Sequence, residues 1–365
     1  MNVCIIGDGL TSLSLAKNLI NKKINVHIYY KKMANNFSSS RTIGISKHNI
    51  EYYEKNILEL NKRIKWQIKK IEIFSEKIKK NKILNFENNN KTLFYMIKND
   101  VLYKSLNDKL SKSKYYKKKV IKENFFYEKL LKKNNYDLII NCDQSNPISK
   151  KYFTKKIIKD YKNFAFTTIL EHEKLENNSA IQVFTSLGPI AFLPISNKKT
   201  SVVCSLDTSN KNYNDNEILK LINKSNPKFK VKKNSKINCF ALKSSNLRKY
   251  YHENILAFGD LLHKIHPLAG QGFNMTIRDI EDLSNIIQDK INLGLQLDPL
   301  IFEEFQSKTK NRNFIFANGI DFIYEFFNFD KKKEGKRLNK ILQYFGTNKT
   351  FMGSLIKFAD KGINI

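Results

Sequence analysis

One stretch of the chain, residues 254–287 (NILAFGDLLHKIHPLAGQGFNMTIRDIEDLSNII), restricts the possible fold more than any other. It reads as a short apolar strand ending in Gly259-Asp260, a loop with His266-Pro267, the triplet Gly270-Gln271-Gly272 and an amphipathic helix. A carboxylate at the end of a strand can accept two hydrogen bonds from ribityl or ribose hydroxyls. Glycines before a helix let backbone N–H groups approach a planar or anionic ligand. The stretch therefore predicts a ligand site between strand and helix.

A second glycine turn lies at the start of the chain. An apolar strand at residues 3–6 leads through Gly7 and Gly9 to the small Ser12, and then into a helix as far as Asn21. In this fingerprint the first glycine permits a tight turn and the second lets a pyrophosphate approach the backbone. The small third residue lets helix and strand pack closely. The start of the chain therefore predicts a dinucleotide-binding α/β unit, although such glycines alone are also found in unrelated α/β enzymes.

The order GD, HP, AGQGFN and an RD-bearing helix resembles the second flavin-binding segment of the group A flavin monooxygenases, most closely that of the ubiquinone-biosynthesis hydroxylases. Residues 40–46 (SRTIGIS) and 184–194 (FTSLGPIAFLP) are similar to two further segments of that family. The resemblance implies an α/β fold with an FAD-binding Rossmann-like domain of the p-hydroxybenzoate hydroxylase type. An inserted antiparallel-sheet substrate domain and a helical C-terminus would complete it.

The resemblance also implies a division of the chain. The FAD-binding domain would be discontinuous, at residues 1–70, 91–160 and 251–300. The substrate-binding sheet domain would take residues 71–90 and 161–250, and the C-terminal helical region residues 301–365. Residues 95–110 resemble a helix of the flavin domain. Phenylalanines of the last region would form a core against that domain or, in a second reading, dip into a membrane surface.

By the same resemblance, residues from four segments would bind the cofactor: Gly7, Gly9, Ser12, Arg41, Asp260, Pro267, Gly270, Gln271, Gly272, Phe273 and Asn274. The guanidinium of Arg41 would lie near the flavin pyrophosphate. The helix after Gly272 would direct N–H groups toward the flavin pyrimidine. No catalytic base is assigned, because His263 and His266 mainly shape the flavin site in this family. No metal site is predicted, since a third ligand at suitable spacing is missing.

Two positions depart from the family pattern. Tyr30 stands at the end of the second strand, where an acid normally holds the adenosine ribose, and a phenol cannot accept two hydroxyls as a carboxylate does. Gln144 follows Asp143 where relatives have glycine, so a positive φ there would strain the backbone. These departures motivate a reading in which the chain is a non-catalytic flavin-fold subunit.

The resemblance implies an FAD-dependent aromatic ring hydroxylase of ubiquinone biosynthesis that uses NAD(P)H and O2. One oxygen atom would pass through a C4a-hydroperoxyflavin to a polyprenylated phenol, with the protein supplying position and exclusion of water. A flavin hydroxylase of another aromatic compound and the non-catalytic subunit remain alternatives. Membership of a ubiquinone-biosynthesis complex is a further expectation.

The composition bears on partners and location. The formal net charge is +31, but the lysines are scattered and form no nucleic-acid module, so no nucleic-acid partner is expected. Such a charge suits contact with an anionic membrane surface. Four dispersed cysteines in apolar runs predict buried, reduced thiols. We therefore expect a cytoplasmic protein that is peripheral on the inner membrane.

Overall fold

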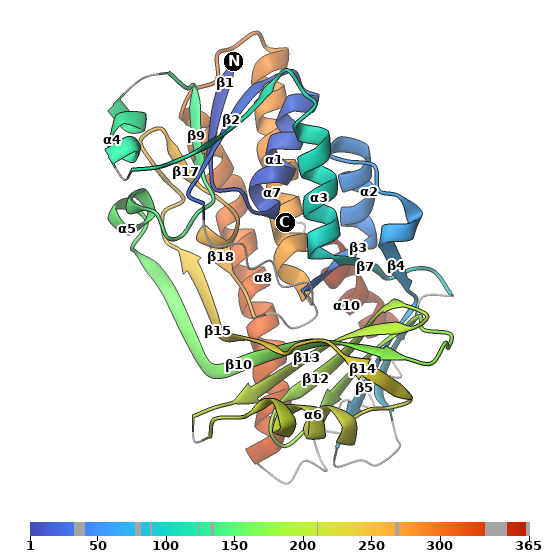
Figure 1. The fold of residues 1–365 in the computed structure, drawn as a ribbon. Helices are drawn as coiled ribbons and strands as arrows, with labels where there is room; N and C mark the ends of the chain where they lie inside the picture. Colours follow the sequence, from blue (N-terminus) through green and yellow to red (C-terminus); the bar gives the residue numbers. More distant parts are fainter. Residues whose placement is uncertain are drawn as a thin grey trace.

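The computed structural model describes residues 1–32, 41–76, 82–87, 90–123, 125–132, 135–209, 211–266, 270–332 and 349–362. Two large sheets lie one above the other in Figure 1, and a long C-terminal helix passes beside both. The upper sheet is mainly parallel with helices on its faces, and the lower sheet is mainly antiparallel. The predicted α/β fold with an inserted antiparallel sheet and a helical C-terminus is confirmed.

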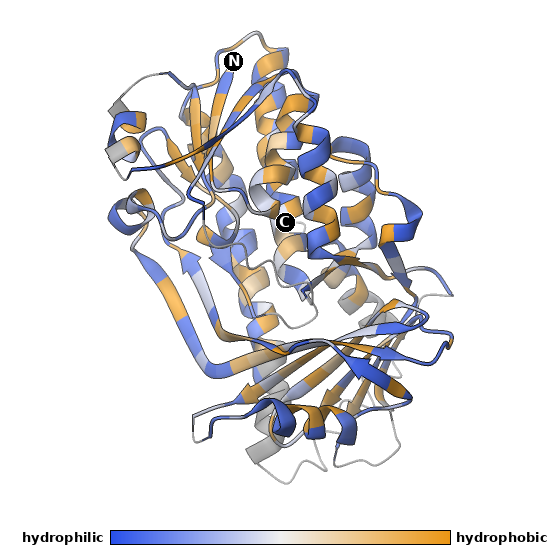
Figure 2. Ribbon diagram, in the orientation of Figure 1, coloured by the Kyte–Doolittle hydropathy of each residue, from blue (hydrophilic) through white to orange (hydrophobic). Residues whose placement is uncertain are grey.

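The central strands of the upper sheet, β1, β9 and β17, are short and almost fully apolar. The strand order of this sheet is β16-β17-β9-β1-β2-β8, and every pair is parallel except β16 with β17. Central strands buried on both faces need such continuous apolar runs. Figure 2 shows these central strands mostly in orange, and blue residues on the outer sides of the helices. The strands are β1 (Asn2–Ile6), β2 (Asn25–Tyr30), β8 (Tyr116–Val120), β9 (Leu138–Asn141), β16 (Tyr251–His252) and β17 (Ile255–Ala257).

Helices cover the upper sheet and connect it to the rest of the chain. In Figure 1, α1, α2, α3 and α7 stand together on one side of it, and α4 and α5 lie on the other. Their bounds are α1 (Leu10–Asn21), α2 (Lys47–Asn56), α3 (Asn99–Leu110), α4 (Phe125–Lys132), α5 (Pro147–Tyr152), α7 (Gln271–Asn292), α8 (Leu300–Lys332) and α10 (Lys349–Lys361). Short 3-10 turns occupy Lys62–Ile64 and Gly259–Leu261. Among the described residues, we find no helix that is both long and apolar enough to span a bilayer.

The lower sheet has nine strands in the order β18-β15-β10-β13-β12-β11-β5-β6, with β14 beside β10. A three-stranded sheet, β3-β7-β4, lies between it and the upper part. The lower strands are β5 (Lys70–Ser75), β6 (Lys82–Glu87), β10 (Lys156–His172), β11 (Ser179–Phe184), β12 (Pro189–Ser196), β13 (Lys199–Asp207), β14 (Val231–Asn234), β15 (Asn238–Leu247) and β18 (His263–Lys264). The small sheet has β3 (Thr42–Ser46), β4 (Lys65–Ile68) and β7 (Phe94–Lys98).

The two faces of the lower sheet meet different neighbours. One face packs its large apolar residues, such as Phe192, against α6 (Asp215–Lys224). The other face looks toward the small sheet, because Thr42 Oγ1 of β3 donates to Ser201 Oγ of β13 at 3.0 Å. Leu193 and Ile195 pack there with Trp66. The lower sheet therefore forms the floor of the space beneath the upper part.

Four details differ from the sequence-based expectations. Residues 94–98 form β7 and not the start of a helix, because they pair with both β3 and β4. Strand β10 runs through the expected domain boundary at residues 160/161. All four cysteines are free, but Cys239 is exposed and Cys142 is only partly buried. Phe322, expected in a core, is 68% exposed.

Candidate functional site

The first glycine turn has the geometry that the fingerprint predicts. Gly7 has φ +109° and its N–H donates to the carbonyl of Tyr29 at 2.8 Å, which turns the chain from β1 into α1. A Cβ on Gly7 would lie 3.3 Å from Ser12 Oγ, whereas a Cβ on Gly9 would meet no atom within 4 Å. The backbone beside Gly9 is therefore open to a ligand, and the buried Ser12 keeps helix and strand close.

The second motif reaches the same edge of the upper sheet. Gly259 has φ +63°, and a Cβ there would lie only 2.6 Å from Cγ2 of Thr11 at the start of α1. This contact sets Asp260, whose side chain is exposed, next to the first glycine turn. The loop after β9 joins them, since Gln144 Nε2 donates to the carbonyl of Asp260. Three loops at the carboxyl ends of β1, β9 and β17 thus meet where α/β sheets bind ligands.

The expected strain at Gln144 does not arise. Its φ is not positive, unlike that of Lys23 or Glu253. The side chain instead bridges to the Asp260 segment. The departure from glycine is therefore compatible with an unstrained loop.

The start of α7 presents the third part of the site. Gly270 is the N-cap with φ +64°, and a Cβ there would lie 3.5 Å from the backbone nitrogen of Gly44 on β3. Gln271 is 6% exposed, and its Oε1 has no hydrogen-bond partner among the described residues. A Cβ on Gly272 would touch only Ile265, at 3.9 Å. Free N–H groups, a helix dipole and an unsatisfied amide oxygen are therefore available to a bound ligand.

Asn274 holds this helix start in place. Its Nδ2 donates to the carbonyl of Gly44 at 2.9 Å, and its Oδ1 accepts from Ser46 N at 2.8 Å and from Asn49 Nδ2 at 3.1 Å. The side chain is 1% exposed. All its polar atoms are engaged by the protein, so a contact with the cofactor would have to come from its backbone.

The remaining expected site residues lie around α7. The partly buried Phe273 contacts the ring of Tyr53 with centroids 6.4 Å apart. Arg41 is exposed and directly precedes β3, the strand that meets the start of α7. Pro267 lies outside the described residues.

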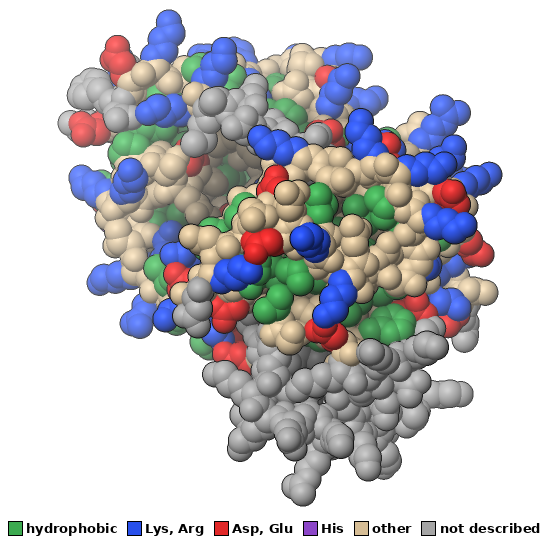
Figure 3. All heavy atoms as spheres, turned by 60° about the horizontal axis from the view of Figure 1, so that its bottom comes forward, with side chains coloured by type: hydrophobic (Ala, Val, Ile, Leu, Met, Phe, Trp, Pro, Cys, Tyr) green, Lys and Arg blue, Asp and Glu red, His purple; other side chains and the backbone are tan. Residues whose placement is uncertain are grey.

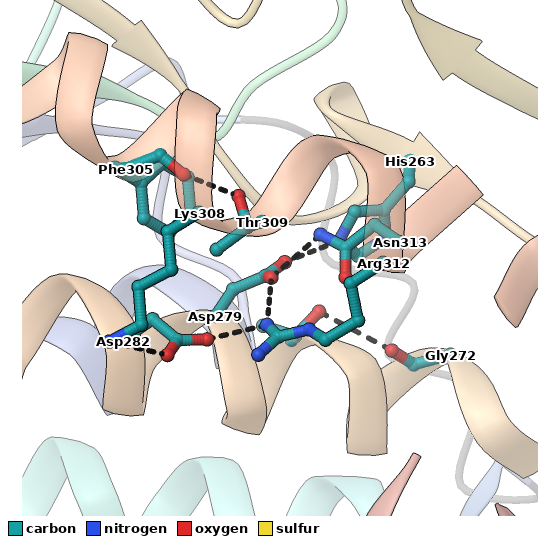
Figure 4. A network of polar contacts seen from close by, with 10 residues as sticks. His263, Gly272, Asp279, Asp282, Phe305, Lys308, Thr309, Arg312 and Asn313 are labelled. Carbon is teal, nitrogen blue, oxygen red and sulfur yellow. Dashed lines mark hydrogen bonds and ion pairs between the residues drawn. The ribbon is translucent and has the colours of Figure 1, made fainter. Parts of the chain in front are cut away.

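A buried polar network ties α7 to α8 (Figure 4). Asp279 Oδ1 accepts from Asn313 Nδ2 at 2.8 Å, and Oδ2 is paired with Nε2 of His263. The side chains of Asp279 and His263 are 0% and 1% exposed. One turn further, Asp282 meets Arg312 and also Lys308, at 3.3 Å. Sequence reasoning missed this network, because its α8 partners follow the motif by about thirty residues without a recognisable pattern.

His263 and His266 thus have separate environments. The ring of His266 stands edge-on to Tyr161 of β10, with centroids 4.7 Å apart. Burial, and then the charge of Lys159, lower the pKa of His266 to about 4. The His266 ring is therefore neutral near pH 7. Among the described residues, no group of three or more metal-ligating side chains comes together.

The floor of the space beneath α7 is uncharged. Thr167 pairs with Val203, which pairs with Ala191. In the next row Ile169 pairs with Ser201, and Ser201 with Leu193. Both rows lie on the face that carries the Thr42–Ser201 contact, because alternate residues of a strand share a face. Small and apolar side chains there suit an aromatic or isoprenoid ligand.

The charged residues have a different distribution. Figure 3 shows lysine and arginine scattered over the face that it presents, without a continuous basic groove. On this face the basic side chains that contribute to the net charge of +31 are thus spread out. Such spreading favours general attraction to anionic surfaces over recognition of one polyanion.

The comparisons with known proteins agree with this geometry. A family model described as an FAD binding domain matches residues 152–292. The chain is 22% identical to the ubiquinone biosynthesis monooxygenase COQ6, mitochondrial, of Dictyostelium discoideum, over 89% of this chain and 84% of that protein. It is 28% identical to the 3-demethoxyubiquinol 3-hydroxylase of Escherichia coli, over 44% of each chain.

A solved structure supports the fold. The p-nitrophenol 4-monooxygenase PnpA of Pseudomonas putida superposes with a TM-score of 0.79 at 12% identity, covering 100% of this chain and 98% of that one. The open backbone at Gly9, the helix start at Gly270 and the unpaired oxygen of Gln271 fit a flavin dinucleotide. With the family match, these features confirm the prediction that the cofactor is FAD.

Proposed function

We infer that this chain belongs to the FAD-dependent monooxygenases of ubiquinone biosynthesis and hydroxylates the ring of a polyprenylated phenol. The observation that carries the proposal is the meeting of three loops and the α7 start above an uncharged sheet face. The loops leave space for a dinucleotide beside the backbone of Gly9. The sheet face presents an uncharged surface that includes Ile169 and Leu193. A flavin and an apolar aromatic substrate need these two surfaces side by side.

FAD would be held along the edge of the upper sheet. Gly7, Gly9 and Ser12 would accommodate the pyrophosphate side, and Asp260 would accept hydrogen bonds from the ribityl chain. Residues at the start of α7, from Gly270 to Phe273, would border the ring system, and Arg41 would approach from β3. When bound, the flavin would accept electrons from NAD(P)H and activate O2 for transfer of one oxygen atom.

The chain's own residues position the substrate and exclude water. The N–H groups at the start of α7 favour negative charge on a neighbouring ring. Asn274 fixes that helix start, and the Asp279–His263 pair fixes the helix from behind. Neutral His266 keeps a positive charge away from the loop. No residue is assigned as a general base.

The direct test is to purify the protein and record its visible spectrum before and after denaturation. Flavin bands, with FAD released into the supernatant, are expected. NAD(P)H, O2 and a prenylated phenol should then give a product heavier by one oxygen, with the label retained from ¹⁸O2. A colourless protein that does not take up excess FAD would overturn the proposal. A flavoprotein that hydroxylates only phenols without a prenyl tail would refute the assignment of substrate.

Peripheral binding to a membrane belongs to the same proposal. A polyprenyl tail resides in the bilayer, and a net charge of +31 would attract the protein to anionic lipid. The protein should sediment with vesicles containing anionic lipid and should be released by salt. Equal binding to purely zwitterionic vesicles would argue against an electrostatic contact. Association with other enzymes of the pathway is proposed as well, and co-purification from its source would test it.

A further inference from the structure

We propose that Asp8, between the two glycines of the first turn, takes over the role of the missing acid at the end of β2 and binds the adenosine ribose of FAD. This inference rests on the proposed flavin function and concerns one half of the cofactor. It explains how the chain can keep a dinucleotide site although Tyr30 occupies the usual position of the carboxylate.

The side chain of Asp8 is directed toward β8 and α3. Tyr103 OH donates to Asp8 Oδ2 at 3.4 Å, and Lys118 Nζ lies 3.5 Å from the same oxygen. Lys118 belongs to β8, the strand beside β2, and Tyr103 to α3. The carboxylate therefore reaches from the end of β1 toward the end of β2. That is the neighbourhood in which a second-strand acid would stand in a dinucleotide fold.

The carboxylate also has capacity left for a ligand. Both contacts fall on Oδ2, and Oδ1 has no hydrogen-bond partner among the described residues. The side chain is 32% exposed, so a ligand can reach it. A carboxylate with one oxygen fixed and the other free can accept hydrogen bonds from a sugar diol.

The surrounding residues hold this arrangement. Lys118 Nζ lies 4.6 Å from the ring centroid of Tyr30 and 3.2 Å from Tyr103 OH, so one cation links both tyrosines to Asp8. Tyr116 lies in the same cluster, and its hydroxyl is buried without a hydrogen-bond partner among the described residues. Buried hydroxyls in folded proteins almost always have a hydrogen-bond partner. The unpaired hydroxyl of Tyr116 therefore indicates that this cluster does more than form an ion pair at the surface.

Tyr30 then has a positive role. Its ring supports Lys118 through a cation–π contact, which an aliphatic residue could not provide. The acid at the end of β2 is thus replaced by an aromatic that supports a lysine, which in turn orients a carboxylate on the neighbouring loop.

The test compares FAD with an analogue whose adenosine carries 2′-deoxyribose, by flavin fluorescence titration of the apoprotein. The natural protein should bind FAD about tenfold more tightly than the analogue, since the analogue lacks one hydroxyl that donates a hydrogen bond to a charged group. Asp8→Asn should lose about the same factor for FAD and no longer distinguish the two ligands. Binding of FMN, which lacks adenosine, should be the same for both proteins.

Restoring the family acid provides the decisive variant. Tyr30→Glu in the Asp8→Asn background should regain FAD affinity and discrimination. Lys118→Met should weaken FAD binding but keep partial discrimination, because the carboxylate remains. If Asp8→Asn binds FAD as the natural protein does, the inference is wrong while the flavin function stands. If no variant and not even the natural protein binds flavin, the proposed function itself fails.

Discussion

Gly259 and Thr11 lie so close together that a Cβ atom on Gly259 would be 2.6 Å from Thr11 Cγ2. The two residues belong to segments nearly 250 positions apart, since Gly259 begins the 3-10 turn after β17 and Thr11 lies in the first turn of α1. Their contact sets the distance between the first glycine turn and Asp260. The geometry of the dinucleotide site between the Gly7–Gly9 turn and Asp260 therefore depends on the absence of a side chain at Gly259.

Replacing Gly259 with alanine should damage both the fold and the site. The backbone has φ +63°, which an alanine adopts only with strain, and the new methyl group would collide with Thr11. We expect Gly259→Ala to lower the free energy of unfolding by about 2 kcal/mol and to purify with little FAD. Urea unfolding and the flavin-to-protein absorbance ratio would measure both effects. Unchanged flavin content would show that the close contact between Gly259 and Thr11 is not needed for FAD binding.

Gly9→Ala should separate cofactor binding from stability. Gly9 has φ −73° and ψ 177°, an extended conformation open to alanine, and a Cβ there meets no protein atom within 4 Å. The unfolding free energy of the apoprotein should stay within about 1 kcal/mol. FAD affinity should fall at least tenfold if the pyrophosphate occupies that space. Gly353→Ala, at another open position, is the matched control and should retain full affinity.

Asn274→Ala should release the start of α7. The change removes four hydrogen bonds and leaves the carbonyl of Gly44 and the amide of Ser46 buried without a partner. We expect a loss of roughly 2–3 kcal/mol in unfolding free energy. Asn292→Ala removes the same side chain from the exposed end of the helix and should cost less than about 0.5 kcal/mol. Similar losses of unfolding free energy in the two variants would contradict the conclusion that Asn274 fixes the start of α7.

The buried carboxylate of α7 offers a similar comparison. Asp279 is fully buried and contacts His263 and Asn313, whereas Asp282 keeps 10% exposure and two cationic neighbours. Asp279→Asn should destabilise the protein by roughly 3 kcal/mol, because two donors then face a side chain that cannot accept from both. Asp282→Asn should cost about 1 kcal/mol. Thermal unfolding of both variants would rank them, and a larger effect at Asp282 would refute this assignment.

The sequence was informative where one local pattern decides the structure. The positive φ of Gly7, Gly259 and Gly270 follows from turns that only glycine forms easily, so these turns and the helices α1 and α7 were predictable. Residues 95–98 were wrongly predicted to be helical, because their strand conformation depends on pairing with β3 and β4 and not on their own pattern. The hydrogen bonds by which Asn274 fixes the start of α7 could likewise not be predicted, since their partners lie about 230 positions away in the sequence.

The adenosine side shows the same limit. The sequence revealed that Tyr30 is not an acid, but not that Lys118 and Asp8 meet above it. That meeting depends on β8 lying beside β2, a long-range parallel pairing that no local pattern encodes.

His266 should make stability sensitive to acid. Burial lowers its pKa from 6.5 to about 4, so between these values the unfolded chain binds a proton that the folded protein does not. The free energy of unfolding is thus not reduced by His266 above pH 6.5, and it decreases as the pH falls from 6.5 toward 4. From pH 7.5 to 5 the loss should be about 2 kcal/mol.

Comparison with His266→Gln isolates this contribution from other titrating groups. Urea unfolding at the two pH values should show the natural protein losing about 2 kcal/mol more than the variant. An NMR titration of the His266 ring should place its midpoint well below that of an exposed histidine. Equal losses in both proteins, with a midpoint near 6.5, would mean that the ring is hydrated and that the contact with Tyr161 does not exclude water.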